Sequence, residues 1–430
     1  MKHSHKFLLL FFLLTFFYFQ SASAAPVQLS LDDSITMAIQ TNPIIKMAEA
    51  GKEKSTWSVR QAKAEKDLTI ELAHTSLRSD VPQSFLATLA PVSPHNYFKN
   101  QLSASIPVYS GGKLESQIEQ ANLNRRISEL QLDMVKQQLK LDVTVAYYQV
   151  LETRNLFEVA TYSVNDFTTH LQQVQKQYDA GTVALPDVLQ TKVQLANAQD
   201  GFIRAKNNYD QAIYCLNTLI GLPIHSEIKL DDTLANEPNA ISLDTCITYA
   251  LGHRLDMKQA QTAVSFTQEK VRAAQSEKHP TVTFDVSNYW DDINFAGTKN
   301  SKWTTSLTAK WNVFDSGLTD AQIKQAAYSV ISATEQVRQI RDAITLEVTK
   351  SYQNMQEAEK RIETNAVAVE QAEVDFRLAK ERYESGFGIN LDVVDAELAL
   401  TQAKTNYVKA LYDYHISKAQ LDKAMGLTVR

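Results

Sequence analysis

The sequence has few residues that interrupt helices. Its 430 residues include only 12 Gly and 10 Pro, below the usual shares of about 7% and about 5%. No proline falls between Pro107 and Pro186 or after Pro280. These gaps exclude a chain made of short, frequently broken elements and predict long, uninterrupted helices.

Several functional signatures are also missing. The sequence has no GxxxxGK phosphate loop and no GxSxG nucleophile motif, and its histidines show no HxxxH or HxxE zinc spacing. An enzyme would also need a compact concave site, which long helices do not easily provide. We therefore expect no enzyme, no cofactor and no bound metal. The formal net charge of -6 gives no indication of a nucleic-acid partner.

The N-terminus has the pattern of a secretory signal peptide. Basic residues precede the apolar run Phe7–Phe19, and small residues at Ala22 and Ala24 mark a cleavage site. We expect cleavage after Ala24, because the run is too short to span a bilayer comfortably. A retained N-terminal anchor is the alternative. For the only cysteines, Cys215 and Cys246, two buried, unbonded thiols are expected, although export leaves a disulfide open.

A short segment of the chain occurs twice. Tyr178–Leu189 reads YDAGTVALPDVL and Tyr383–Val394 reads YESGFGINLDVV. The similarity continues over the flanking residues and indicates two equivalent halves. We expect a signal peptide at 1–24, a first repeat at 25–222, a linker at 223–240 and a second repeat at 241–430. Each repeat would hold a helix, a β-hairpin (68–109 or 281–314) and a long helical hairpin (113–220 or 318–426).

Both predicted β-hairpins alternate apolar with polar residues. An ordinary half-buried hairpin would show the same alternation. The strand length, the long polar connections and the aromatic residues near strand ends favour a transmembrane sheet instead. The expected aromatic girdle is Tyr289, Trp290, Trp303 and Trp311. Because four strands cannot close a barrel and open edges are not tolerated in lipid, several chains must pool their strands.

The helical segments are longer than a globular domain needs. Lys113–Ala180 would extend roughly 100 Å at about 1.5 Å per residue. Two apolar stripes near heptad spacing run along it, which indicates helical neighbours on two sides, as in the wall of a tube. A coiled-coil bundle without a lumen would show the same periodicity.

The repeated segment fits the turn of a helical hairpin. Gly181 in the first copy, and Gly386 and Gly388 in the second, would allow the left-handed turn that ends a helix. Pro186 with Asp187 would begin the next helix in the first copy, and Asn390 would be the N-cap in the second copy. Well-formed helical hairpins explain these residues without any further function.

The export signal, the duplicated halves and the repeated Tyr-x-x-Gly-x5-Asp-Val element resemble the TolC family of trimeric outer-membrane efflux channels. The resemblance extends from about Leu29 to Leu427. It implies a mainly α fold with a small β part and an internal duplication. A long coiled-coil α-helical barrel would stand in the periplasm, and a twelve-stranded transmembrane β-barrel in the outer membrane would be shared by a homotrimer with four strands per chain. The residues near 222–239 would form an equatorial belt.

The resemblance also assigns roles to the hairpin turns. A periplasmic adaptor, coupled to an inner-membrane transporter, would dock at the turns formed by Gly181, Thr182, Gly386, Phe387 and Gly388. The periplasmic mouth would be gated by Asp187, Tyr383, Asp392 and Asp395. Some family members have an arginine where this chain has Gly388, so a salt-bridged gate of that kind is not expected.

The function implied is a passive exit duct of a tripartite efflux or type I secretion system. The sequence does not choose between drug or metal efflux and protein secretion; our hypothesis is the export of small toxic compounds. Two other classes remain open, a periplasmic adaptor and a structural coiled-coil protein without a pore. An adaptor would need a lipoyl-like β domain between its helices, and a structural protein would need no aromatic girdle.

Overall fold

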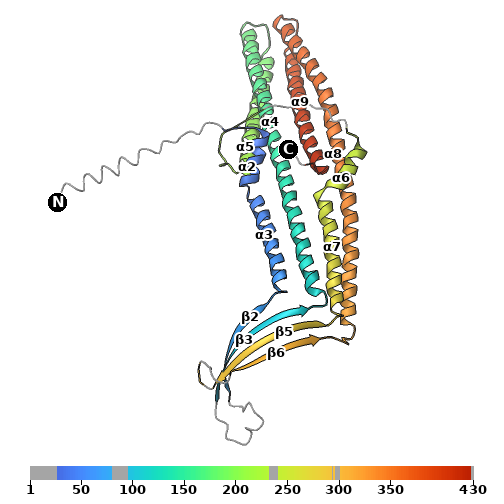
Figure 1. Cartoon of the computed structure of the whole chain (residues 1–430). Coiled ribbons are helices and arrows are strands. Elements are labelled where there is room, and N and C mark those ends of the chain that lie inside the picture. The colour runs from blue at the N-terminus through green and yellow to red at the C-terminus, as the bar shows by residue number, and fades with distance from the viewer. Residues whose placement is uncertain (1–26, 80–94, 232–240, 293, 296–300, 428–430) are drawn as a thin grey trace, which may run out of the picture.

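The computed structural model describes residues 27–79, 95–231, 241–292, 294–295 and 301–427. The predicted signal peptide, with its cleavage residue Ala24, lies outside the described residues. The protein is elongated, with a β-sheet at one end and the turns of two long helical hairpins at the other (Figure 1).

The two halves of the chain have the same order of elements. The first contains α2 (Leu31–Thr41), α3 (Pro43–Ala64), β2 (Thr69–Ser79), β3 (His95–Tyr109), α4 (Lys113–Asp179) and α5 (Leu185–Ile220). The second contains α6 (Leu243–His253), α7 (Leu255–Ser276), β5 (Thr281–Asp292), β6 (Lys302–Lys310), α8 (Leu318–Glu384) and α9 (Asn390–Ala424). The short strands β1 (Val27–Leu29) and β4 (Ile228–Leu230) pair in parallel. Long helices and one pair of long strands per half are confirmed.

The predicted end of the second β-hairpin at Phe314 was wrong. Strand β6 ends at Lys310, which pairs with Thr281 at the start of β5. Pro280 precedes that start and has no backbone N–H for a further ladder bond. Val313 and Phe314 therefore lie beyond the sheet.

The helices form one layer. Along its length α4 contacts α3 and α5 on one side and α7 and α9 on the other, and α8 packs beyond α7 and α9. Helices α3 and α7 lie nearer the sheet, whereas α5 and α9 lie nearer the hairpin turns (Figure 1). The layer therefore has two free edges, one formed by α3 and α5 and the other by α8.

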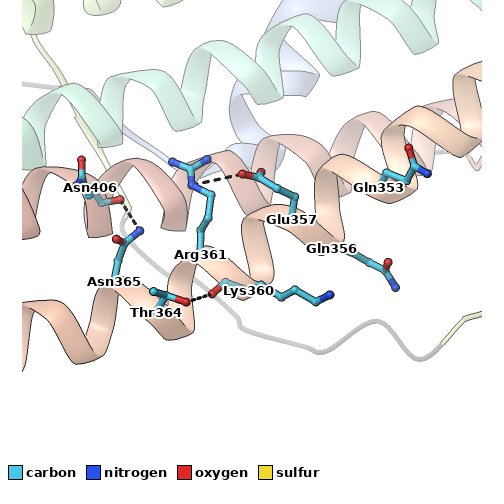
Figure 2. Close-up of a pocket in the computed structure, with 8 residues that line it drawn as sticks. All are labelled: Gln353, Gln356, Glu357, Lys360, Arg361, Thr364, Asn365 and Asn406. Atoms are coloured by element: carbon cyan, nitrogen blue, oxygen red, sulfur yellow. Dashed lines mark hydrogen bonds and ion pairs between the residues drawn. The ribbon is translucent and has the colours of Figure 1, made fainter.

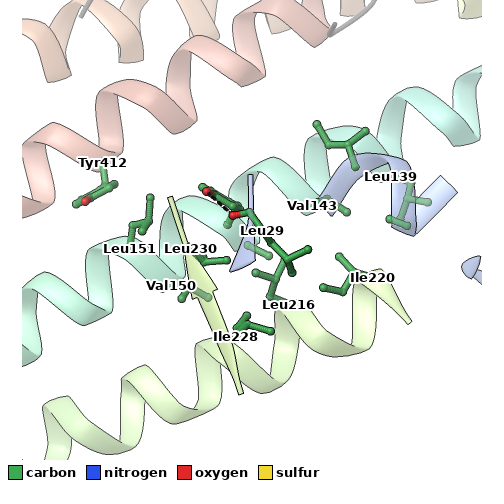
Figure 3. Packing of buried hydrophobic residues seen from close by; sticks show 14 of the residues in the cluster. Leu29, Leu139, Val143, Val150, Leu151, Leu216, Ile220, Ile228, Leu230 and Tyr412 are labelled. Carbon is green, nitrogen blue, oxygen red and sulfur yellow. Dashed lines mark hydrogen bonds between the residues drawn. The ribbon is translucent and has the colours of Figure 1, made fainter. Parts of the chain in front are cut away.

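The largest hydrophobic core lies near the middle of α4. Leu29 of β1 and Leu230 of β4 pack there against Val143 and Val150 of α4 and Leu216 of α5 (Figure 3). The hydroxyl of Tyr147 lies 3.2 Å from the Leu29 carbonyl and 2.8 Å from that of Asp231. The two-stranded sheet is thus fixed to the helical layer.

Equivalent joints in the two halves use different side chains. Between α2 and α3, Asn42 Nδ2 donates to the carbonyl of Leu219, at 3.0 Å. Between α6 and α7, Arg254 Nη1 donates to the carbonyl of Ala424, also at 3.0 Å. Arg254 in addition pairs with Glu347 at 2.6 Å. In each half, this hydrogen bond fixes the junction of two stacked helices to the C-terminal end of a long hairpin helix, α5 in the first half and α9 in the second.

The expectation of two buried thiols holds for only one cysteine. Both cysteines are free; Cys246 is buried, whereas Cys215 is exposed. The sequence pattern around Cys215 is helical, and its exposure follows from its place on a face of α5 that no described element covers.

Candidate functional site

The four long strands form one antiparallel sheet in the order β2-β3-β5-β6. Its register separates the side chains by face, because successive residues of a strand point to opposite sides. Residues Ile70, Leu72, Leu102, Ala104, Ile106, Phe284, Val286 and Leu307 share one face, and Thr69, Glu71, Ser103, Ser105, Thr283, Asp285, Ser306 and Thr308 share the other. The predicted apolar and polar faces are confirmed. The apolar face is open in the single chain, with Leu307 67% exposed.

The predicted girdle residues occupy three different positions. Trp290 and Trp303 lie on the apolar face, at the end of the sheet away from the helices. Trp311 lies just beyond the other end of β6, where its Nε1 donates to the carbonyl of Lys278 at 3.1 Å. The girdle prediction was wrong for Tyr289. This residue is adjacent to Trp290 in the strand and therefore points to the polar face. There the Lys99 ammonium lies 5.2 Å from its ring.

Both long helical hairpins turn through a left-handed glycine. Gly181 has a φ of 75° and donates its N–H to the carbonyl of Tyr178; Gly386 has a φ of 80° and donates to that of Tyr383. This conformation was predicted for both glycines; it was also predicted for Gly388, which does not adopt it. Thr182 and Phe387 follow them and are exposed, Phe387 by 83%.

Close packing of the backbone favours glycine at position 388 in the second turn. Its N–H donates to the carbonyl of Arg382 at 3.0 Å. A Cβ at this position would lie 3.0 Å from the backbone nitrogen of Tyr383 and 3.2 Å from the carbonyl carbon of Arg382. This turn therefore has little room for the arginine found in some family members.

Asn390 is not an N-cap, contrary to the prediction from its sequence position. The helix α9 begins at this residue, Ile389 is the N-cap, and no side chain caps the helix. The Asn390 side chain is instead buried between the two hairpins. His170 Nε2 of α4 donates to its Oδ1 at 2.8 Å, and Thr191 Oγ1 of α5 lies 3.1 Å from the same atom. We call these three residues the tip network.

An apolar cluster of Val174, Val188, Tyr383 and Val393 lies beside the tip network. Tyr383 is 4% exposed, and its ring meets that of His170 edge-on, with centroids 5.1 Å apart. Its hydroxyl has no hydrogen-bond partner among the described residues. Burial, helped by the nearby charge of Asp187, raises the pKa of Tyr383 to about 12.

The predicted gate residues are only partly brought together. Tyr383 and Asp187 lie within electrostatic reach of each other. The side chains of Asp392 and Asp395 are exposed on α9, so a single chain places neither of them in the tip network. Sequence reasoning missed His170, Asn390 and Thr191 as a group, since they come from three distant segments; only a polar residue at an otherwise apolar helix position could have indicated them.

An open polar hollow of about 680 Å³ lies between α8 and α9, with Arg361 and Glu357 on one wall and Asn365 close to Asn406 (Figure 2). Arg361 pairs with Asp413 at 3.0 Å, so its charge is already balanced. In the described ranges no three His, Cys, Asp or Glu side chains gather as metal ligands. None of the described helices is long and apolar enough to span a membrane.

Long helices in one open layer, joined to a sheet with one apolar face and two free edges, form the type of fold seen in outer-membrane channel proteins. Known proteins agree with this class. The outer membrane efflux protein family matches residues 34–222 and 246–427. The chain belongs to this family.

Individual relatives are distant in sequence. The chain is 23% identical to the outer membrane protein TolC of Escherichia coli strain K12, over 68% of its own length and 62% of that protein. It is 23% identical to the alkaline protease secretion protein AprF of Pseudomonas aeruginosa, over 66% of its own length and 60% of that protein. The match thus spans about three fifths of these relatives. The crystal structure of the outer membrane protein VceC of Vibrio cholerae superposes with a TM-score of 0.81 at 20% identity, covering 93% of this chain and 97% of that one.

Proposed function

We propose that this protein is the outer-membrane exit duct of a tripartite efflux or type I secretion system, and that it works as a homotrimer. The observation that supports this best is that the sheet and the helical layer each end in two free edges. Strands β2 and β6 are the edges of the sheet, and unpaired strand edges are too costly to be exposed to lipid. Three copies would join their sheets into one barrel of twelve strands.

The helical edges have the apolar surface that neighbouring copies would cover. Exposed large apolar residues on α3 and α5 are Ile44, Met47, Trp57, Leu185, Leu189, Val193 and Ile203, and those on α8 are Leu318, Tyr328, Ile331, Leu346, Val367, Val374 and Leu378. Surfaces of this kind usually mark protein interfaces. In the trimer, the α3 and α5 edge of one copy packs against α8 of the next and closes a helical tunnel through the periplasm.

The hairpin turns form the inner end of this duct. An adaptor coupled to an inner-membrane transporter docks at Gly181, Thr182, Gly386, Phe387 and Gly388, for which the exposed Phe387 ring provides an apolar contact. Asp187, Tyr383, Asp392 and Asp395 surround the mouth. Three copies of the exposed Asp395 carboxylate around one axis attract cations, so Asp395→Ala reduces cation block in single-channel recordings.

The duct is passive and its cargo is small toxic compounds. A family of efflux channels supports this choice, whereas the secretion role named for AprF supports protein export as the second candidate. A strain lacking the protein accumulates small toxic compounds if the first choice is right. Unchanged accumulation together with loss of a secreted protein would replace it with the second.

The first test of the duct is the mass of the exported, detergent-solubilised protein by light scattering, corrected for detergent. A mass of about three chains in the outer-membrane fraction is expected. A soluble periplasmic monomer would overturn the proposal and favour an adaptor or a structural coiled-coil protein without a pore.

A further inference from the structure

One carboxyl group is buried between the two helical hairpins with incomplete hydrogen bonding. Glu397 of α9 is 3% exposed. Its Oε1 accepts from Thr401 of the same helix at 3.2 Å, and its Oε2 has no hydrogen-bond partner among the described residues. An ionised carboxylate is costly in such a place, because burial removes water that nothing replaces.

The groups facing Glu397 act in both directions. The charge of Asp166 of α4 opposes ionisation, whereas the hydroxyl groups of Thr401 and of Ser163 of α4 favour it. Lys404 of α9 is the nearby cation, but it already pairs with Glu373 of α8 at 2.9 Å. Lys380 of α8 acts on Asp166 and on His170, the other titratable group of this region.

We propose that Glu397 is a proton-dependent latch between the two hairpins, neutral while α9 packs against α4 and ionised when the hairpins part. The latch lies next to the tip network, so parting at Glu397 also separates Asn390 from His170. It extends the proposed function, because these tips form a mouth only if the protein is a duct. The packing of the hairpins, however, can be measured without transport.

The repeat shows that the latch belongs to one seam only. In the first half, the position equivalent to Glu397 is occupied by Lys192, and that equivalent to Asn390 by Leu185. The edge formed by α5 therefore has neither the buried carboxyl nor the buried amide. The seam between α4 and α9 within a chain therefore carries this buried carboxyl, whereas contacts made through α5 have no counterpart of it.

The direction of the pH effect follows from burial. Burial first, and then the charge of Asp166, raise the pKa of Glu397 from 4.5 to about 7. The packed hairpins therefore hold the proton more tightly than parted ones, so packing is favoured in acid and weakened as the pH rises through 7. If the parted state has the ordinary pKa, the ratio of parted to packed hairpins rises about tenfold between pH 6 and pH 8. Burial lowers the pKa of His170, so its charge matters only at the acid end of this range.

Spin labels on the two hairpins test the latch in the purified full-length protein. We would label cysteines introduced at the exposed positions Gln172 of α4 and Ala399 of α9, with the exposed Cys215 replaced by serine. Pulsed electron resonance then gives the fraction of parted hairpins at pH 6 and pH 8. Wild type is expected to show the tenfold rise. The Glu397→Gln variant, which keeps the shape but cannot ionise, is expected to remain packed at both pH values.

Two further variants complete the test. Glu381→Gln removes an exposed carboxyl of α8 and should leave the wild-type response unchanged. Asp166→Asn removes the charge that helps to raise the pKa of Glu397, so it should reduce the rise in parted hairpins between pH 6 and pH 8, and it serves as the test if Glu397→Gln does not fold. An unchanged distance in wild type, or the same pH response in wild type and Glu397→Gln, would overturn the latch. Absence of conductance in lipid bilayers would instead count against the duct and leave the distance result as it stands.

Discussion

Replacing Asn390 by leucine, the residue that the first half has at the equivalent position, should loosen the hairpin tips. Asn390 is 3% exposed, and its Oδ1 accepts from His170 Nε2 at 2.8 Å. Leucine removes this bond and leaves the buried His170 N–H without its acceptor, at a cost of about 1–3 kcal/mol. The free energy of local opening should therefore fall by about 1–3 kcal/mol. Amide hydrogen exchange at the start of α9 should accelerate by about 5- to 160-fold.

A double substitution separates this cause from a simple loss of packing. In His170→Leu/Asn390→Leu both partners are apolar, so no buried N–H is left unpaired and most of the protection should return. If the free energy of opening in the double variant falls by the sum of the two single-variant changes, the reasoning is refuted. The Thr191 hydroxyl also donates to the carbonyl of Asp187 at 2.8 Å, so it keeps a partner in every variant.

Three further outcomes are expected. Leu307→Arg puts a charge on the apolar face of the sheet and should weaken folding into lipid vesicles by about 2–4 kcal/mol, whereas Ser306→Arg on the polar face should have little effect. Tyr383→Phe removes a buried hydroxyl without a described partner and should leave tip exchange unchanged or slow it, by up to about 1 kcal/mol; faster exchange would show that the assembled trimer supplies a partner. Gly388→Arg should lower the thermal stability of the second turn by about 1–3 kcal/mol because its Cβ would crowd the backbone of Tyr383, while Phe387→Arg, at an exposed position, should change it little.

The parts of the fold that follow from periodicity could be predicted from the sequence. Alternation with a period of two fixed which strand residues share a face, and the register confirms it for Ile70 and Leu307. The long segment without proline predicted α4, and the need for positive φ predicted Gly181 and Gly386. These features depend only on residues close together in the chain.

The two features that failed did so for different reasons. Asn390 has the right residue type and position for an N-cap, yet it lies within reach of His170 and Thr191, and those bonds take its side chain away from its own helix. Local patterns cannot show this outcome without the packing between hairpins. Tyr289 is aromatic and near a strand end, but the alternation that puts Phe284 and Val286 on the apolar face already puts Tyr289 on the polar one.

The duplication explains why the two seams of the helical layer should behave differently. Both hairpins have the same turn geometry at Gly181 and Gly386, so each could pack against its neighbour in the same way. The second hairpin places Asn390 and Glu397 in the seam within the chain, where the first has Leu185 and Lys192 on the free edge. A buried polar seam fixes one arrangement and costs energy when a partner is lost, whereas an apolar edge tolerates small shifts in packing. In the proposed duct, opening of the mouth should therefore begin at the seam that carries the protonatable residue, and closure of the ring of subunits should rely on the apolar edges.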